Sequence, residues 1–210
     1  MEKKTIASIS LTSGILWIFI LQYLFLSVDG LRSATITALR GMYNALGDGL
    51  FTGTVLVLSG AIFGAFVFQL LSKRFEIVFT VLLTLAYFYA LFYALFLKSP
   101  GTRGINMNLA EFGREFTYTP LDTMWNILLF LPIGLLLQLL IKSTWKSALA
   151  GFVLVVMVEG AQYIFSAGIF DVIDILMNTL GVFLGALIIS SATLDGWSFG
   201  FDRHFLTFSK

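Results

Sequence analysis

The chain has 210 residues, of which 58% are hydrophobic and 12% are charged, and its mean hydropathy is +0.93. A soluble protein of this size cannot bury so much apolar surface, so the composition indicates an integral membrane protein. The 13 Lys and Arg residues nearly balance the 12 Asp and Glu residues, which argues against a nucleic-acid partner, and the absence of cysteine excludes disulfides and thiolate nucleophiles.

The hydropathy pattern predicts six membrane-spanning helices, because each apolar segment has about the ~20 residues that a helix needs to cross the hydrocarbon. In chain order these segments run from Ile6 to Val28, Phe51 to Leu71, Phe75 to Leu97, Met124 to Ile141, Ser147 to Ser166 and Phe170 to Ser190. The first is too long for the apolar part of a cleavable signal, so we expect it to be retained. The predicted fold class is an all-α membrane protein, a bundle of about six transmembrane helices.

The basic residues predict how this bundle is oriented. Two short loops, one with Lys73 and Arg74 and the other with Lys142 and Lys146, fall on the same side of the membrane. That side also holds more Lys and Arg than the other. Because short cytoplasmic loops are enriched in these residues, we expect this side to be cytoplasmic, together with both chain termini.

Two longer loops then face outward. Leu31 to Leu50 has apolar residues near helical spacing, so it either forms an interfacial helix or is an ordinary connector. Lys98 to Thr123 opens with a Pro-Gly turn and is too polar to lie in lipid. The aromatic-rich tail, residues 191–210, is expected at the cytoplasmic membrane surface.

Polar residues interrupt the fifth and sixth helices. They are Glu159 and Gln162, spaced i, i+3, and then Asp171, Asp174 and Asn178, spaced i, i+3, i+7. Each set falls on one helical face. If the hairpin turns at about residues 167–169, Glu159 lies level with Asn178 and Gln162 with Asp174. Asn126, in the first turns of the fourth helix, could join them. The pattern predicts a polar pocket open to the outer leaflet.

A carboxylate within the membrane is unfavourable by ~2.5 to 3.5 kcal/mol, so such residues are usually functional. Structural alternatives exist for the others. Asp171 and Asp174 could complement and cap the N-terminus of the sixth helix, and the amides of Asn126, Gln162 and Asn178 could simply hold helices together. The GxxxG pair of Gly181 and Gly185, with Gly151 and Gly160 opposite, predicts close packing of the fifth and sixth helices.

Three segments resemble the VanZ family. They are NILLFLPIG at 126–134, EGAQ at 159–162 and FDVIDILMNTLGVFLG at 170–185, and the loop RGINMNLAEF at 103–112 is similar to that family's R-x-x-N stretch. The resemblance covers residues 75–190 and leaves out residues 1–74, the first two helices, and the tail at 191–210. Members commonly carry an arginine where this chain has Gly168 and Ile169, and Arg103 or Arg114 from the outer loop could substitute.

The resemblance implies a multi-pass protein of the bacterial cell membrane that lowers susceptibility to teicoplanin-type lipoglycopeptides. Its partners would be membrane lipids and, at the outer pocket, a cell-wall precursor or the drug. The predicted ligand-binding residues are Arg103, Asn126, Glu159, Gln162, Asp171, Asp174 and Asn178. No cofactor or resident metal is predicted and no catalytic residue is assigned. The alternatives are a metal-dependent enzyme acting on an outer-leaflet lipid head group and a proton-coupled lipid transporter.

Overall fold

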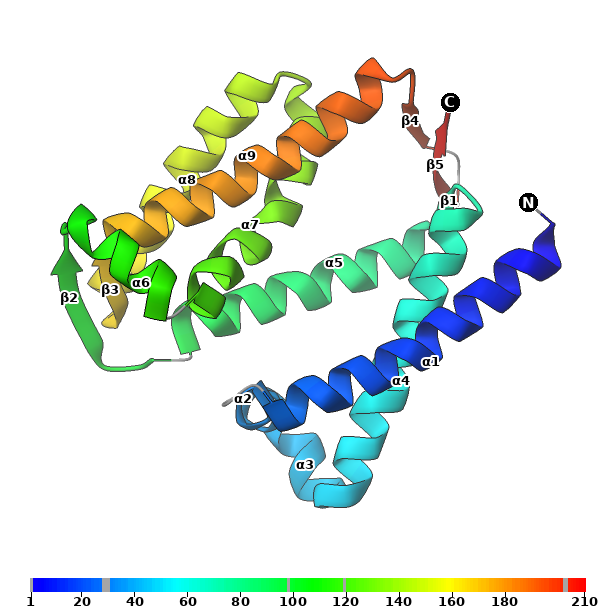
Figure 1. Cartoon of the computed structure of the whole chain (residues 1–210), viewed down its shortest axis with the longest axis horizontal. Helices are drawn as coiled ribbons and strands as arrows, with labels where there is room; N and C mark the ends of the chain where they lie inside the picture. Colours follow the sequence, from blue (N-terminus) through cyan, green and yellow to red (C-terminus); the bar gives the residue numbers. More distant parts are fainter. Residues whose placement is uncertain (1, 28–30, 98, 119, 202–203) are drawn as a thin grey trace. The chain divides into compact units, whose positions relative to one another are not determined.

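The computed structural model describes residues 2–27, 31–97, 99–118, 120–201 and 204–210. Within these residues, six helices are long and apolar enough to cross a membrane, which confirms the all-α bundle (Figure 1). They are α1 (Lys3–Ser27), α4 (Asp48–Leu71), α5 (Ile77–Phe92) continued by the π-helical turn η1 (Tyr93–Leu97), α7 (Pro120–Ile141), α8 (Thr144–Ile164) and α9 (Val172–Leu194). Their orientation in the membrane stays a prediction.

The chain divides into two compact units, and α5 runs from one into the other. The first unit contains Met1–Thr84 and Phe199–Ser209, and the second contains Leu85–Ser198. The first unit therefore joins the first two membrane helices to the end of the chain, whereas the second holds all the residues predicted to bind a ligand.

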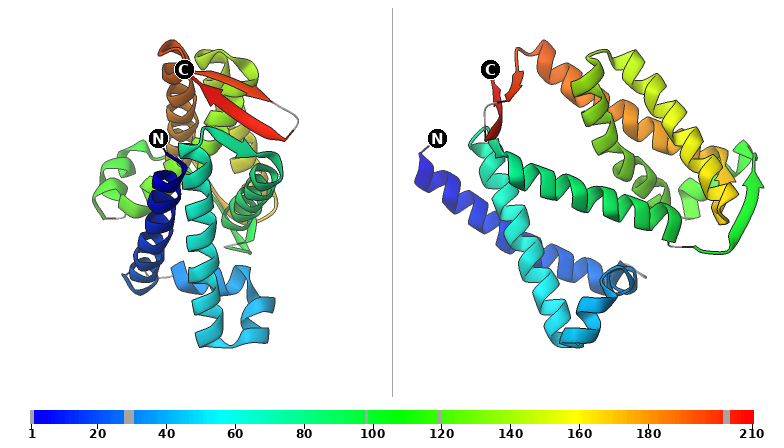
Figure 2. Two further views of the ribbon diagram at one scale, coloured as in Figure 1. Left: turned by 90° about the vertical axis from the view of Figure 1, so that its right-hand side faces the viewer. Right: turned by 180° about the vertical axis from the view of Figure 1, so that it is seen from behind.

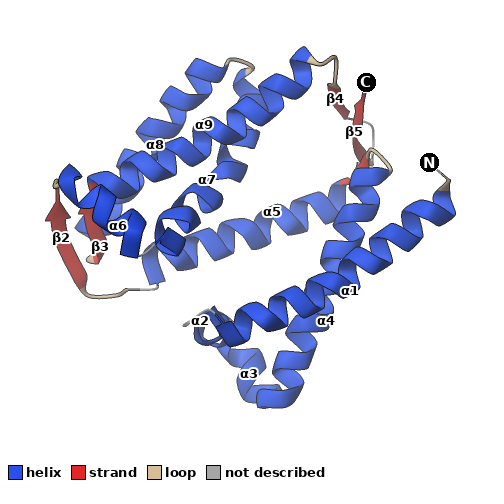
Figure 3. Ribbon diagram, in the orientation of Figure 1, coloured by secondary structure: helices blue, strands red, loops and turns tan. Residues whose placement is uncertain are grey.

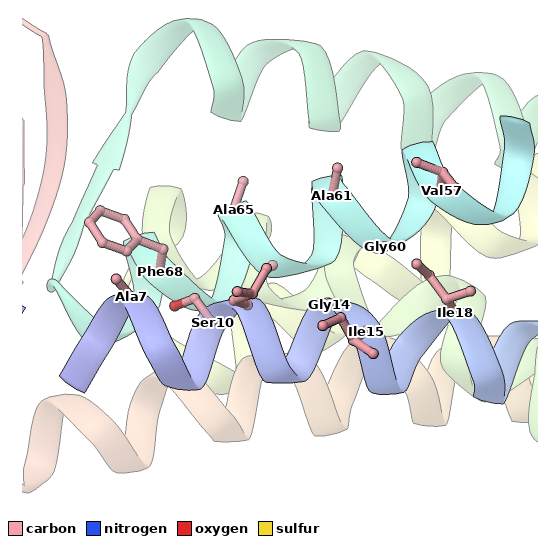
Figure 4. A pocket seen from close by; sticks show the side chains of 12 residues that line it. Ala7, Ser10, Gly14, Ile15, Ile18, Val57, Gly60, Ala61, Ala65 and Phe68 are labelled. Atoms are coloured by element: carbon pink, nitrogen blue, oxygen red, sulfur yellow. The ribbon is translucent and has the colours of Figure 1, made fainter. Parts of the chain in front are cut away.

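In the first unit, α1 and α4 approach closely because glycines face each other where they cross (Figure 4). A Cβ atom added at Gly60 would lie 2.8 Å from the carbonyl oxygen of Gly14, and one at Gly64 would lie 3.0 Å from that of Ser10. The Ser10 hydroxyl donates to the Ile6 carbonyl at 2.7 Å, so this polar group does not face lipid unpaired. The pair thus packs through backbone contact, as small residues allow in membranes.

The loop between α1 and α4 forms two short helices, α2 (Leu31–Ala38) and α3 (Arg40–Leu46), which is the helical one of the two alternatives left open for it. Leu39 interrupts them with ψ of 33°. An ion pair between Arg32 and Asp48 links α2 to the start of α4. Whether these helices lie on the membrane surface stays a prediction.

The aromatic tail contributes two strands, β4 (Ser198–Phe201) and β5 (Phe205–Ser209), to a sheet with β1 (Arg74–Glu76), in the order β1-β5-β4 (Figure 3). In the antiparallel β1–β5 pair Arg74 lies opposite Thr207. The Arg74 guanidinium sits 4.2 Å from the centre of the Phe205 ring. The tail thus pairs and packs with β1, the segment between α4 and α5.

In the second unit, α7, α8 and α9 lie side by side (Figure 2). Phe130, Val155, Ile175 and Val182, from these helices, belong to one buried core. The hydroxyl of Tyr87, on α5, donates to the Leu129 carbonyl of α7 at 2.6 Å. These contacts connect the four helices of this unit.

The GxxxG pair packs against a different helix from the one predicted. Cβ atoms at Gly181 and Gly185 would collide with the backbone carbonyls of Ile127 and Leu131, which belong to α7 and not to α8. A Cβ at Gly134 would collide in turn with the backbone of Val182. Of the two small residues predicted on α8, Gly151 does contact α9, through the Val182 side chain, whereas Gly160 has nothing within 4 Å. The closest helix pair in this unit is therefore α7 with α9.

A two-stranded parallel ribbon joins the loop between α5 and α7 to the α8–α9 connection. Its strands are β2 (Thr102–Asn106) and β3 (Ala167–Asp171), with Arg103 beside Gly168 and Asn106 beside Asp171. The sequence predicted only a turn at residues 167–169. Between β2 and α7 lie a short 3-10 helix, η2 (Leu109–Glu111), and α6 (Phe112–Tyr118).

Candidate functional site

Glu159 lies on α8, one and a half turns before its end, and only 2% of the residue is exposed. Its carboxylate accepts two long hydrogen bonds, each of 3.5 Å, from the backbone N–H of Asp171 and from Nδ2 of Asn178. Asn178, on α9, is also 2% exposed. Glu159 and Asn178 therefore lie level with each other in the α8–α9 hairpin, as predicted.

Asp171 ends β3 and is the N-cap of α9. Its Oδ1 accepts from the backbone N–H of Ile173 at 2.8 Å, and its Oδ2 accepts from Nδ2 of Asn106 at 2.8 Å. The capping alternative for this residue is thus observed. The cap also leaves the Asp171 backbone N–H facing Glu159. One residue therefore links the ribbon, the start of α9 and the buried glutamate.

Asp174 lies one turn into α9 and accepts a hydrogen bond from Nδ2 of Asn126 on α7. Both side chains are half-buried. Asn126 therefore joins the polar cluster through Asp174 and connects α7 to it.

Gln162 has a different partner from the one that its predicted level suggests. Its Nε2 donates to the Leu95 carbonyl, in η1, at 2.8 Å. Its Oε1 is buried and has no hydrogen-bond partner within the described part of the chain. Gln162 therefore ties α8 to the end of α5, at the edge of the cluster.

Arg103 is exposed, and its guanidinium lies 4.3 Å from the centre of the Tyr163 ring on α8. Its backbone pairs with Gly168 in the β2–β3 register. Among the described side chains, the only ion pair is that of Arg32 with Asp48, so no ion pair links Arg103 to the acids. The side chain of Arg114 lies outside those that the structure describes.

Asn106 belongs to this cluster, although it was not among the predicted ligand-binding residues. The β2–β3 register places it beside Asp171, and its side-chain amide holds the Asp171 carboxylate. The signal was present in the R-x-x-N segment, which this chain fills with Arg103 and Asn106. We define the polar cluster as Asn106, Asn126, Glu159, Asp171, Asp174 and Asn178.

The chemistry of the polar cluster is that of hydrogen bonding between acids and amides. Each of the three carboxylates accepts from an asparagine: Asp171 from Asn106, Asp174 from Asn126 and Glu159 from Asn178. Among the residues that the structure describes, no three His, Cys, Asp or Glu side chains are grouped so that they could hold a metal ion. The three carboxylates of the cluster thus act as hydrogen-bond acceptors for asparagine amides.

Comparison with known proteins agrees with the segments that form this cluster. The family model for VanZ/LLP1 matches residues 77–193, which is more than half of the chain. Protein VanZ of Enterococcus faecium is 40% identical over 82 residues, which are 38% of this chain and 50% of that protein, so the similarity spans about half of the relative's length. No solved structure matches the chain. The chain belongs to the VanZ/LLP1 family and is a multi-pass bacterial membrane protein.

Proposed function

We propose that this protein lowers the susceptibility of its bacterium to teicoplanin-type lipoglycopeptides, and that it does so by binding a ligand at the polar cluster. The ligand is a membrane lipid, a cell-wall precursor or the drug itself. The observation that carries the proposal is the burial of Glu159, with Asn178 against it, inside a helix long enough to span the membrane.

Helix packing alone does not account for this glutamate. The α7–α9 contact is made by backbone atoms at Gly181 and Gly185, which is how membrane helices associate without charged groups. A carboxylate in a membrane helix is unfavourable by ~2.5 to 3.5 kcal/mol. Because glycine contacts hold the helices together without a carboxylate in the membrane, a binding role explains Glu159 better than packing does.

The expected orientation supports the same reading. If the loops that contain Lys73 and Lys142 are cytoplasmic, the α8–β3–α9 turn is at the outer side of the membrane. Lipid-linked cell-wall precursors and the acyl chain of a lipoglycopeptide are exposed there. The polar cluster would then meet its ligand within the outer leaflet.

The proposal is tested by expressing the protein in a susceptible bacterium from which its own VanZ-family genes have been removed. We expect a several-fold higher inhibitory concentration of teicoplanin, and a smaller change for a glycopeptide that lacks the acyl chain. Equal susceptibility with and without the protein, when it is present in the membrane, would contradict the proposal.

A further inference from the structure

Two buried acceptor groups of the polar cluster are short of hydrogen-bond donors. The carboxylate of Glu159 accepts only two bonds within the described part of the chain, and both, at 3.5 Å, are at the upper limit for a hydrogen bond. The Oδ1 atom of Asn178 is buried without any partner among the described residues. Buried polar groups are nearly always paired, so an unpaired one calls for an explanation, such as a bound ion or molecule.

A second acidic residue lies next to the same pair. The backbone N–H of Asp171 is 3.5 Å from Oε2 of Glu159. The side chain of Arg103, which the structure describes, lies over the Tyr163 ring and forms no ion pair with Asp171 or Glu159. The buried pair therefore favours a group that carries positive charge in addition to N–H donors.

We infer that Glu159 and Asn178 bind a primary ammonium group. This inference rests on the proposed function, because it names the chemistry of the ligand at the same site. An ammonium offers three N–H donors and a positive charge. Within the described part of the protein, the Glu159 carboxylate and Asn178 Oδ1 have no partner of this kind. A quaternary ammonium has the charge but no N–H, and a hydroxyl has the donor but no charge. A phosphate would be repelled.

A metal ion fits the contacts less well than an ammonium. The two aspartates accept from Asn106 and Asn126 and do not converge on one point with Glu159. Divalent cations need several oxygen ligands around one centre.

The Asp171 carboxylate is the acidic group next to the buried pair on the less buried side. Asp171 is half-buried, and its backbone N–H lies 3.5 Å from Oε2 of Glu159. A cation that first meets the Asp171 carboxylate is therefore close to the buried pair. The amine could be attached to a lipid or be free in water, and the experiment separates these two sources.

The test uses the full chain in phosphatidylcholine nanodiscs, because the head group of this lipid has no N–H donor. Dodecylammonium, dodecyltrimethylammonium and dodecanol are added at equal mole fraction, and ethanolamine is added to the water in a separate arm. The readout is the thermal midpoint of unfolding. A ligand of the folded state at concentrations well above its Kd should raise this midpoint by roughly 3 °C in a chain of this size.

We expect a saturable rise with dodecylammonium that is absent with the other two dodecyl compounds. A rise with ethanolamine as well would assign the amine to a water-soluble source, whereas its absence would assign it to a lipid. Equal rises with dodecylammonium and dodecyltrimethylammonium, or no rise with any amine, would overturn the inference.

Two variants locate the response. Glu159→Gln removes the charge and should lose the rise. Glu76→Gln is the matched control and should keep it, because Glu76 is on β1 and its carboxylate only caps the Phe79 N–H. If Glu159→Gln does not fold, the comparison of the probes on the unaltered protein still decides. A protein that protects against teicoplanin without an ammonium response would refute this inference alone, whereas an ammonium response without protection would refute the proposed function alone.

Discussion

The Nδ2 atom of Asn178 on α9 lies 3.5 Å from Oε1 of Glu159 on α8, and each residue is 2% exposed. This contact fixes the level at which the two antiparallel helices meet. It also places a carboxylate and an amide inside helices that are otherwise apolar. The polar cluster around this contact is the part of the molecule to which the predictions below refer.

The first prediction concerns the packing that holds α7 against α9. Gly181→Ala places a Cβ atom against the Ile127 carbonyl, so it should lower the free energy of unfolding in detergent by about 1–3 kcal/mol. Gly160→Ala is the matched control, because a Cβ there meets nothing within 4 Å. Thermal unfolding of both variants measures the difference. Equal stabilities would mean that α7 and α9 are further apart than described.

The second prediction concerns the β2–β3 ribbon. The parallel register pairs Gly104 with Ile169, and a Cβ at Gly104 would lie 3.5 Å from Ile169 Cγ1. The double variant Gly104→Cys/Ile169→Cys should therefore form a disulfide under mild oxidation. In the control Ile105→Cys/Ile169→Cys the side chains point to opposite faces and should not link. Cutting the chain between the two positions and running a non-reducing gel measures the link, because a disulfide keeps the two fragments together. The reverse pattern would shift the register by one residue.

Some of this structure could be predicted from the sequence, because membrane spans depend on local apolar length. The same holds for the shared face of Asp174 and Asn178, which follows from spacing within one helix, whereas Asp171, which was predicted on that face, ends β3 and precedes the helix as its N-cap. The partner of the GxxxG pair could not be predicted. Gly181 and Gly185 indicate that a helix comes close, but their own sequence does not say that it is α7.

The ribbon was missed for a related reason. β2 and β3 have five residues each and are separated by more than 60 positions, so no local pattern pairs them. Without that pairing, the position of Asn106 beside Asp171 could not be derived from spacing. Gln162 was placed level with Asp174 by hairpin geometry alone, whereas its actual acceptor, the Leu95 carbonyl, belongs to a π-helical turn that the sequence does not reveal.

The third prediction concerns orientation. The chain contains no cysteine, so an introduced cysteine is the only thiol of the protein that can be labelled. Ser72→Cys and Ser143→Cys should resist a membrane-impermeant thiol reagent in intact cells, because they lie in the basic loops assigned to the cytoplasm. Thr102→Cys should react. The opposite labelling would place the polar cluster at the cytoplasmic side and remove the support for an extracellular ligand.

The fourth prediction concerns divalent cations. Adding Mg²⁺, Ca²⁺ or Mn²⁺ to chelator-treated protein should leave its thermal midpoint unchanged, because asparagine amides already donate to the carboxylates of Asp171 and Asp174. A cation that bound only the folded protein would raise the midpoint. A saturable rise that disappears in Glu159→Gln would favour the metal-dependent lipid enzyme over a binding protein.

The most direct measurement is the teicoplanin susceptibility of cells that produce Glu159→Gln, with Glu76→Gln as control and with the amount of each protein in the membrane determined. Glutamine keeps the volume and most of the hydrogen bonding of glutamate but removes its charge. We predict that cells producing Glu159→Gln are as susceptible to teicoplanin as cells without the protein. Cells producing Glu76→Gln should be protected as well as cells producing the unaltered chain. Full protection by Glu159→Gln at an equal membrane level would contradict a binding role for the buried carboxylate.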